Sequence, residues 1–235
     1  MILIDGDMLV YRVGFACDEE EENIATQTMG NYISEILADL SCQYDEQELL
    51  QVKVFLTGSS NFRDEVAVSQ PYKGDRPARK PVHKDALRQY LIDEWDASVS
   101  DNKEADDDIA IQAAKLEYDC VICSLDKDFK QIPCNLYDYT KKMLTPVNKL
   151  DAELWIYKQA LMGDRVDNIL GVRGIGPKKA DKLIDPCKSA VEAFNVCLET
   201  YEDNGLDRDR LVESLTLLYL LRSEDDSYKV PDEAE

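Results

Sequence analysis

Four short apolar runs, separated by amphipathic stretches, restrict the fold of this chain more than any other feature. The runs span Ile2–Ile4, Val52–Leu56, Cys120–Ser124 and Leu136–Tyr139. Because short buried strands that alternate with amphipathic helices build parallel sheets covered by helices, we expect an α/β fold with a mainly parallel central sheet flanked by helices.

The helical patterns continue after the strand patterns have ended. We expect helices at Ile24–Leu40, Lys84–Trp95, Asp106–Tyr118, Ala152–Met162, Pro177–Ile184, Ala190–Tyr201 and Asp207–Leu221. From about residue 150 onward the sequence contains no strand pattern. We therefore expect two parts, an α/β part at residues 1–150 and a helical part at residues 151–235.

The charged residues are distributed unevenly along the chain. The 235 residues include 48 acidic and 27 basic ones, which gives a formal net charge of −21. Such a charge argues against nucleic-acid binding, which normally requires a basic surface. Nine of the basic residues, however, lie in Tyr72–Lys84 and Gly171–Lys182, and each of these segments contains only one acid. An acidic body with two basic segments can orient a polyanion; two solvated basic faces are the simpler alternative.

The sequence excludes several classes of protein. No apolar run reaches the roughly 18 residues of a membrane span, and Met1–Ile4 leads into Asp5 rather than into the core of a signal peptide. The seven cysteines are odd in number, and Cys120 and Cys123 would point to opposite faces of an expected strand. We expect buried thiols in the reducing cytoplasm, no membrane partner, and no zinc site built from the single histidine, His83.

Acidic clusters follow the expected strands and begin an expected helix. They are Asp5-Gly6-Asp7, Glu104-Ala105-Asp106-Asp107-Asp108, Asp126-Lys127-Asp128 and Gly163-Asp164-Arg165-Val166-Asp167-Asn168. Because the carboxyl ends of parallel strands share one edge, Asp5 and Asp126 should project into the same crevice. A divalent cation relieves the repulsion of such carboxylates, and six to eight hard oxygen ligands suit two Mg²⁺ or Mn²⁺ ions. Singly, each cluster is also typical of helix capping or of a turn.

A glycine-rich segment has the composition of a phosphate-binding turn. It reads Gly171-Val172-Arg173-Gly174-Ile175-Gly176-Pro177-Lys178-Lys179, with a proline suited to the first turn of a helix and two lysines beside it. Glycines allow backbone N–H groups to approach an anion. The spacing differs from the GxGxxG and GxxxxGK(S/T) nucleotide-binding motifs. It favours a helix-hairpin-helix that grips a nucleic-acid backbone, with an ordinary helix connection as the alternative.

Five motifs, taken in order, resemble those of the 5′ nuclease family. They are Asp5-Gly6-Asp7, Tyr72-Lys73-Gly74-Asp75-Arg76, Glu104-Ala105-Asp106-Asp107, Asp126-Lys127-Asp128-Phe129 and Gly163–Asn168, the last followed by the glycine-rich segment. The family includes flap endonucleases, the 5′ nuclease domain of bacterial DNA polymerase I and phage 5′–3′ exonucleases; Asn61-Phe62-Arg63 and Ser124–Lys130 are most similar to the phage enzymes. The resemblance covers about residues 1–184. It implies a PIN-like nuclease core with a helical arch at residues 63–97, and a DNA-binding helix-hairpin-helix at residues 163–184.

The resemblance also implies a reaction and its residues. The enzyme would hydrolyse DNA phosphodiester bonds at 5′ ends, nicks or flaps by two-metal-ion catalysis with Mg²⁺ or Mn²⁺, leaving 5′ phosphates. The implied metal ligands, direct or through water, are Asp5, Glu104, Asp106, Asp107, Asp126, Asp128, Asp164 and Asp167. Lys73 and Arg76 would face the scissile phosphate. RNA–DNA hybrids are a further candidate substrate, and we expect a monomer in the cytoplasm, the host cytoplasm if a phage encodes it.

The implied DNA contacts fall in three places. Tyr72 has an aromatic face that can stack on a base, with a packed arch residue as the alternative. The glycine-rich hairpin would hold the duplex through its phosphates, and K⁺ could bind there; its contacts are Arg173, Lys178, Lys179 and the backbone around Gly174 and Gly176. Lys141 and Lys142, in an expected hairpin, are weaker phosphate contacts with a solvated surface as the alternative.

The chain departs from the family at one metal ligand. Relatives usually place an acid just after the second strand, where this chain reads Thr57-Gly58-Ser59, and Asp7 is the candidate replacement. The chain after Ile184 is short and acidic, so we expect modest, salt-dependent DNA affinity. Two alternatives stay open: a PIN-like ribonuclease, which the basic arch segment and the glycine-rich hairpin disfavour, and a non-catalytic protein that binds DNA structures.

Overall fold

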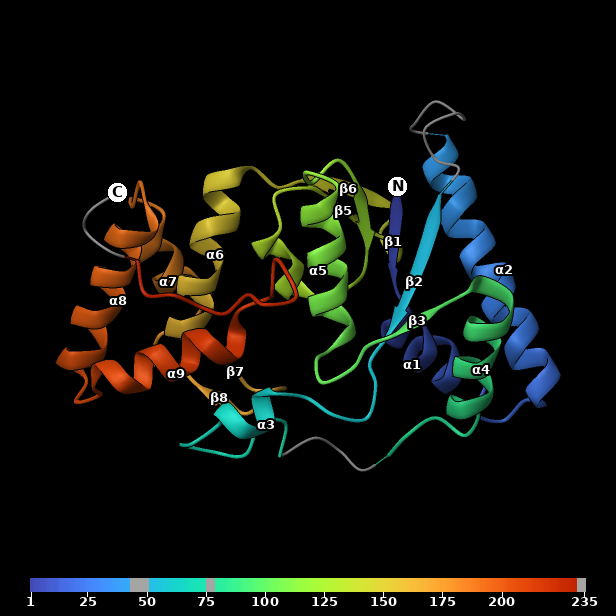
Figure 1. The fold of residues 1–235 in the computed structure, drawn as a ribbon, viewed down its shortest axis with the longest axis horizontal. Coiled ribbons are helices and arrows are strands. Elements are labelled where there is room, and N and C mark those ends of the chain that lie inside the picture. The colour runs from blue at the N-terminus through green and yellow to red at the C-terminus, as the bar shows by residue number, and fades with distance from the viewer. Residues whose placement is uncertain (43–50, 75–78, 232–235) are drawn as a thin grey trace. The chain divides into compact units, whose positions relative to one another are not determined.

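The computed structural model describes residues 1–42, 51–74 and 79–231 and divides the chain into two compact units (Figure 1). The first unit comprises Met1–Ser60, Ala78–Phe129 and Cys134–Pro146; the second comprises Asn61–Pro77, Lys130–Pro133 and Val147–Glu235. Each unit has its own cluster of buried apolar side chains. The functional boundary near residue 150 stays a prediction.

A six-stranded sheet forms the centre of the first unit. In the described part of the chain its strands are β1 (Ile2–Asp5), β2 (Val52–Leu56), β3 (Ser98–Val99), β4 (Val121–Cys123), β5 (Asn135–Asp138) and β6 (Met143–Pro146), in the order β3-β2-β1-β4-β5-β6. All neighbours pair in parallel except β5 and β6. The expected mainly parallel sheet is thereby confirmed. Strand β1 lies in its middle and is buried along its whole length, which is why Ile2–Ile4 is apolar without alternation.

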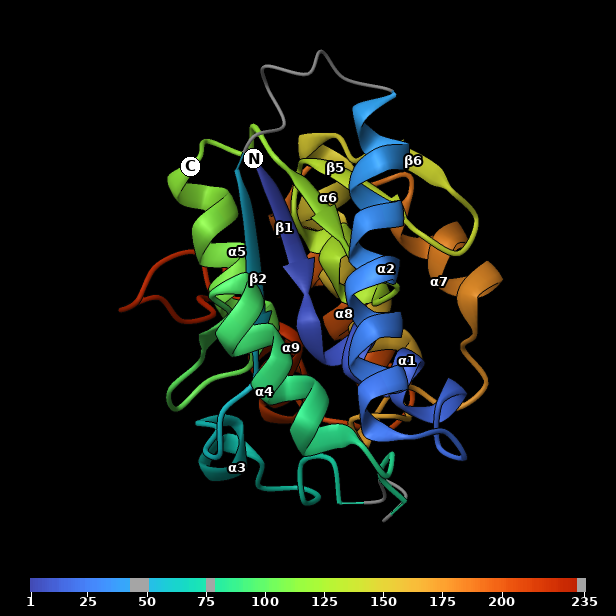
Figure 2. The same ribbon diagram turned by 90° about the vertical axis from the view of Figure 1, so that its right-hand side faces the viewer.

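Helices cover both faces of this sheet. They are α1 (Gly6–Ala16), α2 (Glu22–Ser41), α4 (Lys84–Trp95) and α5 (Ala105–Lys115). Figures 1 and 2 show α1, α2 and α4 on one face and α5 on the other. The sequence patterns do not predict α1, because Asp5-Gly6-Asp7 resembles a cluster of metal-binding acids after a strand. Asp5 in fact caps this helix, since its Oδ1 accepts a hydrogen bond of 3.0 Å from the backbone N of Met8.

The second unit is mainly helical. Its elements are α3 (Arg63–Val66), α6 (Lys149–Met162), β7 (Gly163–Asp164), β8 (Ile169–Leu170), α7 (Pro177–Ile184), α8 (Ala190–Asp203) and α9 (Arg208–Leu218); a short 3₁₀ helix spans Lys127–Gln131. Strands β7 and β8 pair antiparallel. A Cβ atom on Gly171 would lie 2.2 Å from the backbone N of Gly163, so this hairpin can form only with glycine at residue 171.

No helix in the described part of the chain is long and apolar enough to cross a bilayer.

The cysteines are present as thiols, as we expected. None of the seven cysteines forms a disulfide. Six of them are buried, whereas Cys42, at the end of α2, is exposed and corrects the expectation that all would be buried.

A buried arginine fixes the end of α9. The side chain of Arg63 is 1% exposed and lies over the ring of Phe62. Its Nε donates to the carbonyl of Leu217 at 2.8 Å and its Nη2 to the carbonyl of Tyr219 at 2.7 Å. Leu217 lies in the last turn of α9 and Tyr219 is the residue after it, and carbonyls at this end have no intrahelical donors. Arg63 therefore supplies the hydrogen bonds that the end of α9 lacks.

We expect Arg63→Leu to lower the free energy of unfolding of the protein by about 3 kcal/mol, because it takes the donor from one buried and one partly buried carbonyl. Urea denaturation followed by circular dichroism measures this loss. The matched control is Arg79→Leu, because Arg79 is exposed: it pairs with Asp18 at the surface, an interaction worth at most about 1 kcal/mol, and lies 5.5 Å from the ring centroid of Phe15. Equal losses in the two variants would contradict the role of Arg63.

Candidate metal and nucleic-acid site

A buried serine links two acids at the carboxyl edge of the sheet. Asp5 ends β1 and is 2% exposed, and Asp126 follows β4. Ser124 Oγ donates to Asp5 Oδ2 at 2.6 Å and accepts from the backbone N of Asp126 at 3.0 Å. The parallel pairing of β1 with β4 thus brings the two segments to one edge.

The charge on Asp5 is costly in this setting. Burial raises the pKa of its carboxyl group to about 7, and the negative charges of Asp7 and Asp126 act in the same direction. Hydrogen bonds from Ser124 and from the backbone of Met8 lower the pKa by less than burial raises it. A carboxylate that is buried beside other acids is stabilised by a hard divalent cation, so this donor set fits Mg²⁺ or Mn²⁺.

The start of α5 brings further acids to the same edge. Glu104 caps the helix: its side chain accepts from the backbone N of Asp107, and Asp107 Oδ2 accepts from the backbone N of Glu104 at 3.1 Å. The side chain of Asp107 is fully buried, and that of Asp106 is partly exposed. The backbone N of Ala105 donates to Thr57 Oγ1 at 3.0 Å, which fastens the helix start to the segment after β2.

The described carboxylates are held by protein donors and do not form a closed metal cage. No group of three or more His, Cys, Asp or Glu side chains among the described residues is arranged to hold an ion. Asp126 Oδ1, for example, accepts from the backbone N of Asp128 at 2.9 Å. The metal-ligand assignments of these acids stay predictions.

Asp7, the candidate replacement for the missing acid, is held by hydrogen bonds from α4 and from the segment after β2, and its role as a metal ligand stays a prediction. Its Oδ1 accepts from Arg88 Nη1 at 2.8 Å, and its Oδ2 accepts from the backbone N of Thr57 at 2.7 Å. Arg88 also donates to the carbonyl of Thr57 at 2.8 Å. Asp7 therefore joins α1, α4 and the end of β2. Sequence reasoning missed Arg88, because no spacing relates it to Asp7 across 81 residues.

Close packing explains why residue 58 is glycine. A Cβ atom on Gly58 would lie 2.0 Å from the carbonyl oxygen of Ser100. The segments after β2 and β3 are held together by a hydrogen bond of 2.8 Å from the backbone N of Ser100 to the carbonyl of Leu56. No acidic side chain fits at this position without a backbone shift.

In the second unit, Asp164 and Asp167 lie beside the start of the expected arch. Asp164 is buried, and its Oδ1 accepts from the backbone N of Val166 at 2.8 Å and of Asp167 at 3.2 Å. Lys73 Nζ lies 3.8 Å from Asp167 Oδ1, and the hydroxyl of Tyr72 donates to Asp167 Oδ2 at 3.1 Å. The ring of Tyr72 is 8% exposed, which favours the packed alternative over base stacking. Arg76 lies outside the described residues.

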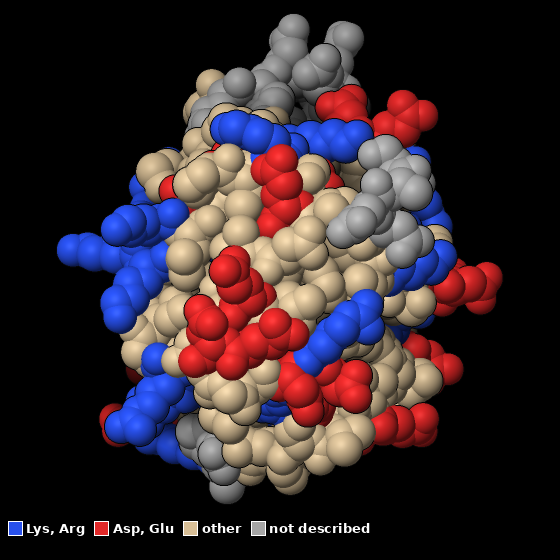
Figure 3. Space-filling model, turned by 90° about the vertical axis from the view of Figure 1, so that its left-hand side faces the viewer, with Lys and Arg blue, Asp and Glu red and all other residues tan. Residues whose placement is uncertain are grey.

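The glycine-rich hairpin presents its basic residues to solvent. Side chains or backbone are exposed at Arg173, Gly174, Gly176, Lys178 and Lys179. Gly174 has φ +80°, and a Cβ atom on either of these two glycines would meet nothing within 4 Å, so an anion can approach the backbone. Lys179 Nζ donates to the carbonyl of Gly174 at 2.8 Å. Figure 3 shows one face of the molecule, on which Lys and Arg lie at the left, along the top and at the right, around acids that lie near the middle.

The lysines of the β5–β6 hairpin are paired with acids. Lys141 Nζ lies 2.8 Å from Asp138, and Lys142 Nζ lies 3.0 Å from Asp39. The pairing with Asp39 raises the pKa of Lys142. These partners offset the two positive charges, which weakens both lysines as candidates for phosphate contacts.

Relatives of the chain are found among bacterial DNA-processing proteins, although no protein-family model matches it. The chain is 31% identical over 212 residues to DNA polymerase I of Bacillus caldotenax, covering 78% of this chain and 23% of the polymerase. It is 32% identical over 121 residues to flap endonuclease Xni of Shewanella pealeana, covering 46% of this chain and 47% of that Xni. Xni of Shewanella frigidimarina is 26% identical to it over 212 residues, covering 83% of this chain and 79% of that Xni. The chain thus spans less than a quarter of the polymerase.

Solved structures of the T5 5′-exonuclease have a similar fold. One with bound zinc ions superposes with a TM-score of 0.68 at 20% identity, covering 93% of this chain and 88% of that chain. A T5 flap endonuclease complex with DNA and metal ions superposes with a TM-score of 0.64 at 19% identity, covering 93% and 88%. At this level of identity the likeness concerns the fold.

We expect Gly58→Asp to destabilise the protein by about 1 to 3 kcal/mol rather than to add a metal ligand, because its Cβ would collide with the backbone of Ser100. Thermal denaturation with and without Mn²⁺ tests this. Ser59→Asp adds the same charge at the next, exposed position and should leave the stability unchanged. A Gly58→Asp variant that is as stable as the parent and binds Mn²⁺ more tightly would show the reason for glycine to be wrong.

The raised pKa of Asp5 makes the metal-free protein less stable as the pH rises. In the unfolded chain this carboxyl ionises near 3.8, and in the folded chain near 7, so the folded state binds more protons between these values. The protonated carboxyl of Asp5 stabilises the folded state fully below about pH 4, and this stabilisation is lost by pH 7. The loss lowers the free energy of unfolding by at most about 4 kcal/mol.

We expect Asp5→Asn to raise the melting temperature of the metal-free protein at pH 8 by more than at pH 4. Asp18→Asn is the control of opposite sign, because a hydrogen bond from the backbone N of Val82 lowers the pKa of Asp18. The ionised carboxyl of Asp18 stabilises the folded state at neutral pH, and this stabilisation is lost in acid. If the melting temperatures of the two variants changed with pH in the same direction relative to the parent, the raised pKa of Asp5 and the lowered pKa of Asp18 would both be contradicted.

Proposed function

We infer, because this chain belongs to the 5′ nuclease family, that it is a structure-dependent 5′–3′ exonuclease and flap endonuclease acting on DNA. The observation that carries this proposal is the acidic edge of the first unit. Asp5 at the end of β1, Asp126 after β4 and Glu104 at the start of α5 come from distant parts of the sequence. The similarity to DNA polymerase I over 78% of the chain supports the same conclusion.

The proposed ligands of two divalent ions are the acids implied by the family motifs. They are Asp5, Glu104, Asp106, Asp107, Asp126, Asp128, Asp164 and Asp167. Bound Mg²⁺ or Mn²⁺ would lower the pKa of a water molecule and stabilise charge on the attacking and leaving oxygens. The buried Asp5 requires such a charge partner more than any exposed acid does, since its pKa is raised to about 7.

Basic residues would act on the phosphate itself. The ammonium of Lys73 and the guanidinium of Arg76 are proposed to offset the negative charge that builds up on the scissile phosphate. Neither needs to transfer a proton, so the chemistry does not depend on a histidine. The products are expected to carry a 5′ phosphate and a 3′ hydroxyl.

The glycine-rich hairpin is proposed to hold the duplex next to the cut. The exposed backbone at Gly174 and Gly176 and the side chains of Arg173, Lys178 and Lys179 would contact phosphates, which select DNA structure rather than sequence. The proposal also includes K⁺ bound at this turn, RNA–DNA hybrids as additional substrates, and a monomeric state of the protein. The seven cysteines, none of which forms a disulfide, favour the cytoplasm as the compartment of the protein.

One observation supports a second candidate, a non-catalytic protein that binds branched DNA. Gly58 stands where the family motifs imply an acid, and both carboxylate oxygens of Asp7 accept hydrogen bonds, from Arg88 and from the backbone of Thr57. By those motifs, the chain would offer one carboxylate fewer for the two ions. Mapping of cleavage on end-labelled nicked, flapped and blunt duplexes, with and without Mn²⁺, separates the candidates: binding of a 5′ flap without cutting would favour the second.

We expect Asp126→Asn to lower cleavage of a 5′-flap substrate by at least about a hundredfold while the protein stays folded, since it removes a charged metal ligand but keeps the shape of the side chain. Single-turnover cleavage in Mg²⁺ gives the rate, and circular dichroism gives the folded fraction.

Asp203→Asn is the control for the loss of one negative charge, because Asp203 is an exposed acid in α8. It should leave the rate within about twofold of the parent. Near-parental cleavage by Asp126→Asn would remove this residue from the proposed site.

A further inference from the structure

Two loops of the second unit are fastened together by three hydrogen bonds. The turn Pro71–Gly74 leads into the expected arch, and the loop Asp164–Asn168 connects β7 to β8. The backbone N of Lys73 donates to the carbonyl of Asp167 at 3.0 Å, the hydroxyl of Tyr72 donates to Asp167 Oδ2 at 3.1 Å, and Asn168 Nδ2 donates to the carbonyl of Pro71 at 2.9 Å. Asp167 thus receives both a backbone and a side-chain bond from the turn.

We propose that Tyr72 is a positioning residue for the metal site, and that its hydroxyl fixes the carboxylate of Asp167 for a divalent cation. This inference rests on the proposed function, in which Asp167 is a metal ligand. It assigns to Tyr72 a role within the protein in place of stacking on a DNA base.

The geometry of the carboxylate supports this role. Tyr72 holds Oδ2 of Asp167, while Oδ1 lies 3.8 Å from the ammonium of Lys73, on the side where positive charge is already accommodated. Hydrogen-bond donors behind a ligating carboxylate set its orientation, and their loss typically weakens metal binding by about 10- to 100-fold. Asp164 is oriented in a different way, by the backbone of its own loop.

The ring of Tyr72 is itself held in place. It is 8% exposed and belongs to the apolar cluster that includes Tyr157, Leu161 and Ile169. A ring in this position can stack on a base only after leaving the cluster. Its hydroxyl, by contrast, already meets the carboxylate without any movement.

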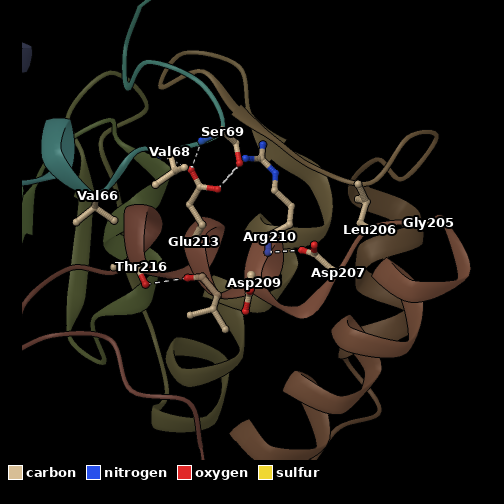
Figure 4. Close-up of a pocket in the computed structure, with 11 residues that line it drawn as sticks. Val66, Val68, Ser69, Gly205, Leu206, Asp207, Asp209, Arg210, Glu213 and Thr216 are labelled. Atoms are coloured by element: carbon tan, nitrogen blue, oxygen red, sulfur yellow. Dashed lines mark hydrogen bonds and ion pairs between the residues drawn. The ribbon is translucent and has the colours of Figure 1, made fainter.

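The segment that precedes the turn is anchored independently. Glu213 of α9 accepts hydrogen bonds from the backbone N of Val68 at 2.8 Å and of Ser69 at 2.7 Å, and it pairs with Arg210 at 3.0 Å. Figure 4 shows Glu213 and Arg210 beside Ser69, in the wall of a cavity of about 500 Å³. Removal of the Tyr72 hydroxyl should therefore leave the turn in place, so that a change in metal affinity reports on Asp167.

The test is the Mn²⁺ affinity of the full-length Tyr72→Phe protein without DNA, measured by isothermal titration calorimetry. The variant keeps the ring and loses only the hydroxyl. We expect Mn²⁺ to bind about tenfold more weakly, and cleavage at low Mn²⁺ to fall by a similar factor and recover at saturating Mn²⁺. KM for the flap substrate at saturating Mn²⁺ should not change.

The matched control is Tyr201→Phe. Tyr201 is a buried tyrosine of the same unit, and its hydroxyl donates to the carbonyl of Ala160 at 2.7 Å. This variant should lose stability but bind Mn²⁺ like the parent. A second variant, Asn168→Gly, removes the bond to Pro71 without strain, because residue 168 has φ 58°. It should also weaken Mn²⁺ binding, by a smaller factor.

Parental Mn²⁺ affinity in a folded Tyr72→Phe protein would overturn the proposal. A parental affinity together with a raised KM for DNA in Tyr72→Leu would assign the ring to base stacking instead. If Tyr72→Phe fails to fold, an Asn168→Gly protein with parental affinity would have the same consequence. If the parent binds Mn²⁺ but cuts no DNA, the proposed function fails, while the titrations still decide the role of Tyr72.

Discussion

Burial of the Asp5 carboxyl group is the constraint on which the candidate site depends. Asp5 lies at the end of the central strand, caps α1 and bonds to Ser124, so it cannot move toward solvent without loosening all three. The positive end of a helix and two donors favour its ionised form, yet burial outweighs them and raises its pKa to about 7. A cation of high charge is the partner that makes such an acid stable in its ionised form at neutral pH.

The neighbouring acids are held in ways that differ in their consequences. Glu104 and Asp107 bond reciprocally with the start of α5, and Asp7 is committed to Arg88 and Thr57. The first pair has a structural role that is compatible with ligation, because an ionised carboxylate offers about four lone-pair sites. Asp7 accepts a hydrogen bond at each oxygen, and its bonds to Arg88 and Thr57 give it a structural role. Acids of two sequence motifs are thus held differently, and the hydrogen bonds distinguish them.

Local patterns predicted most of the secondary structure. The bounds expected for Lys84–Trp95 and Pro177–Ile184 are those of α4 and α7, because a regular apolar period and a proline at the first turn mark them. The missed elements are short or lack a period of their own: β3, β7 and β8 have two residues each, β6 and α3 have four each, and α1 begins inside a motif interpreted as metal-binding acids. The β7–β8 pair also shows that the expectation of no strand after residue 150 was wrong.

The sequence by itself determined the alternation of strands and helices, the positions of the acids after the strands, and the basic glycine-rich turn, because each depends on neighbours along the chain. Only the tertiary structure decided that Arg88 donates to the carboxylate of Asp7, that the backbone of Ser100 excludes a side chain at Gly58, and that the hydroxyl of Tyr72 donates to Asp167. These partners lie from 42 to 95 residues apart, and no local period encodes a hydrogen bond or a collision between strands that meet only in the folded chain.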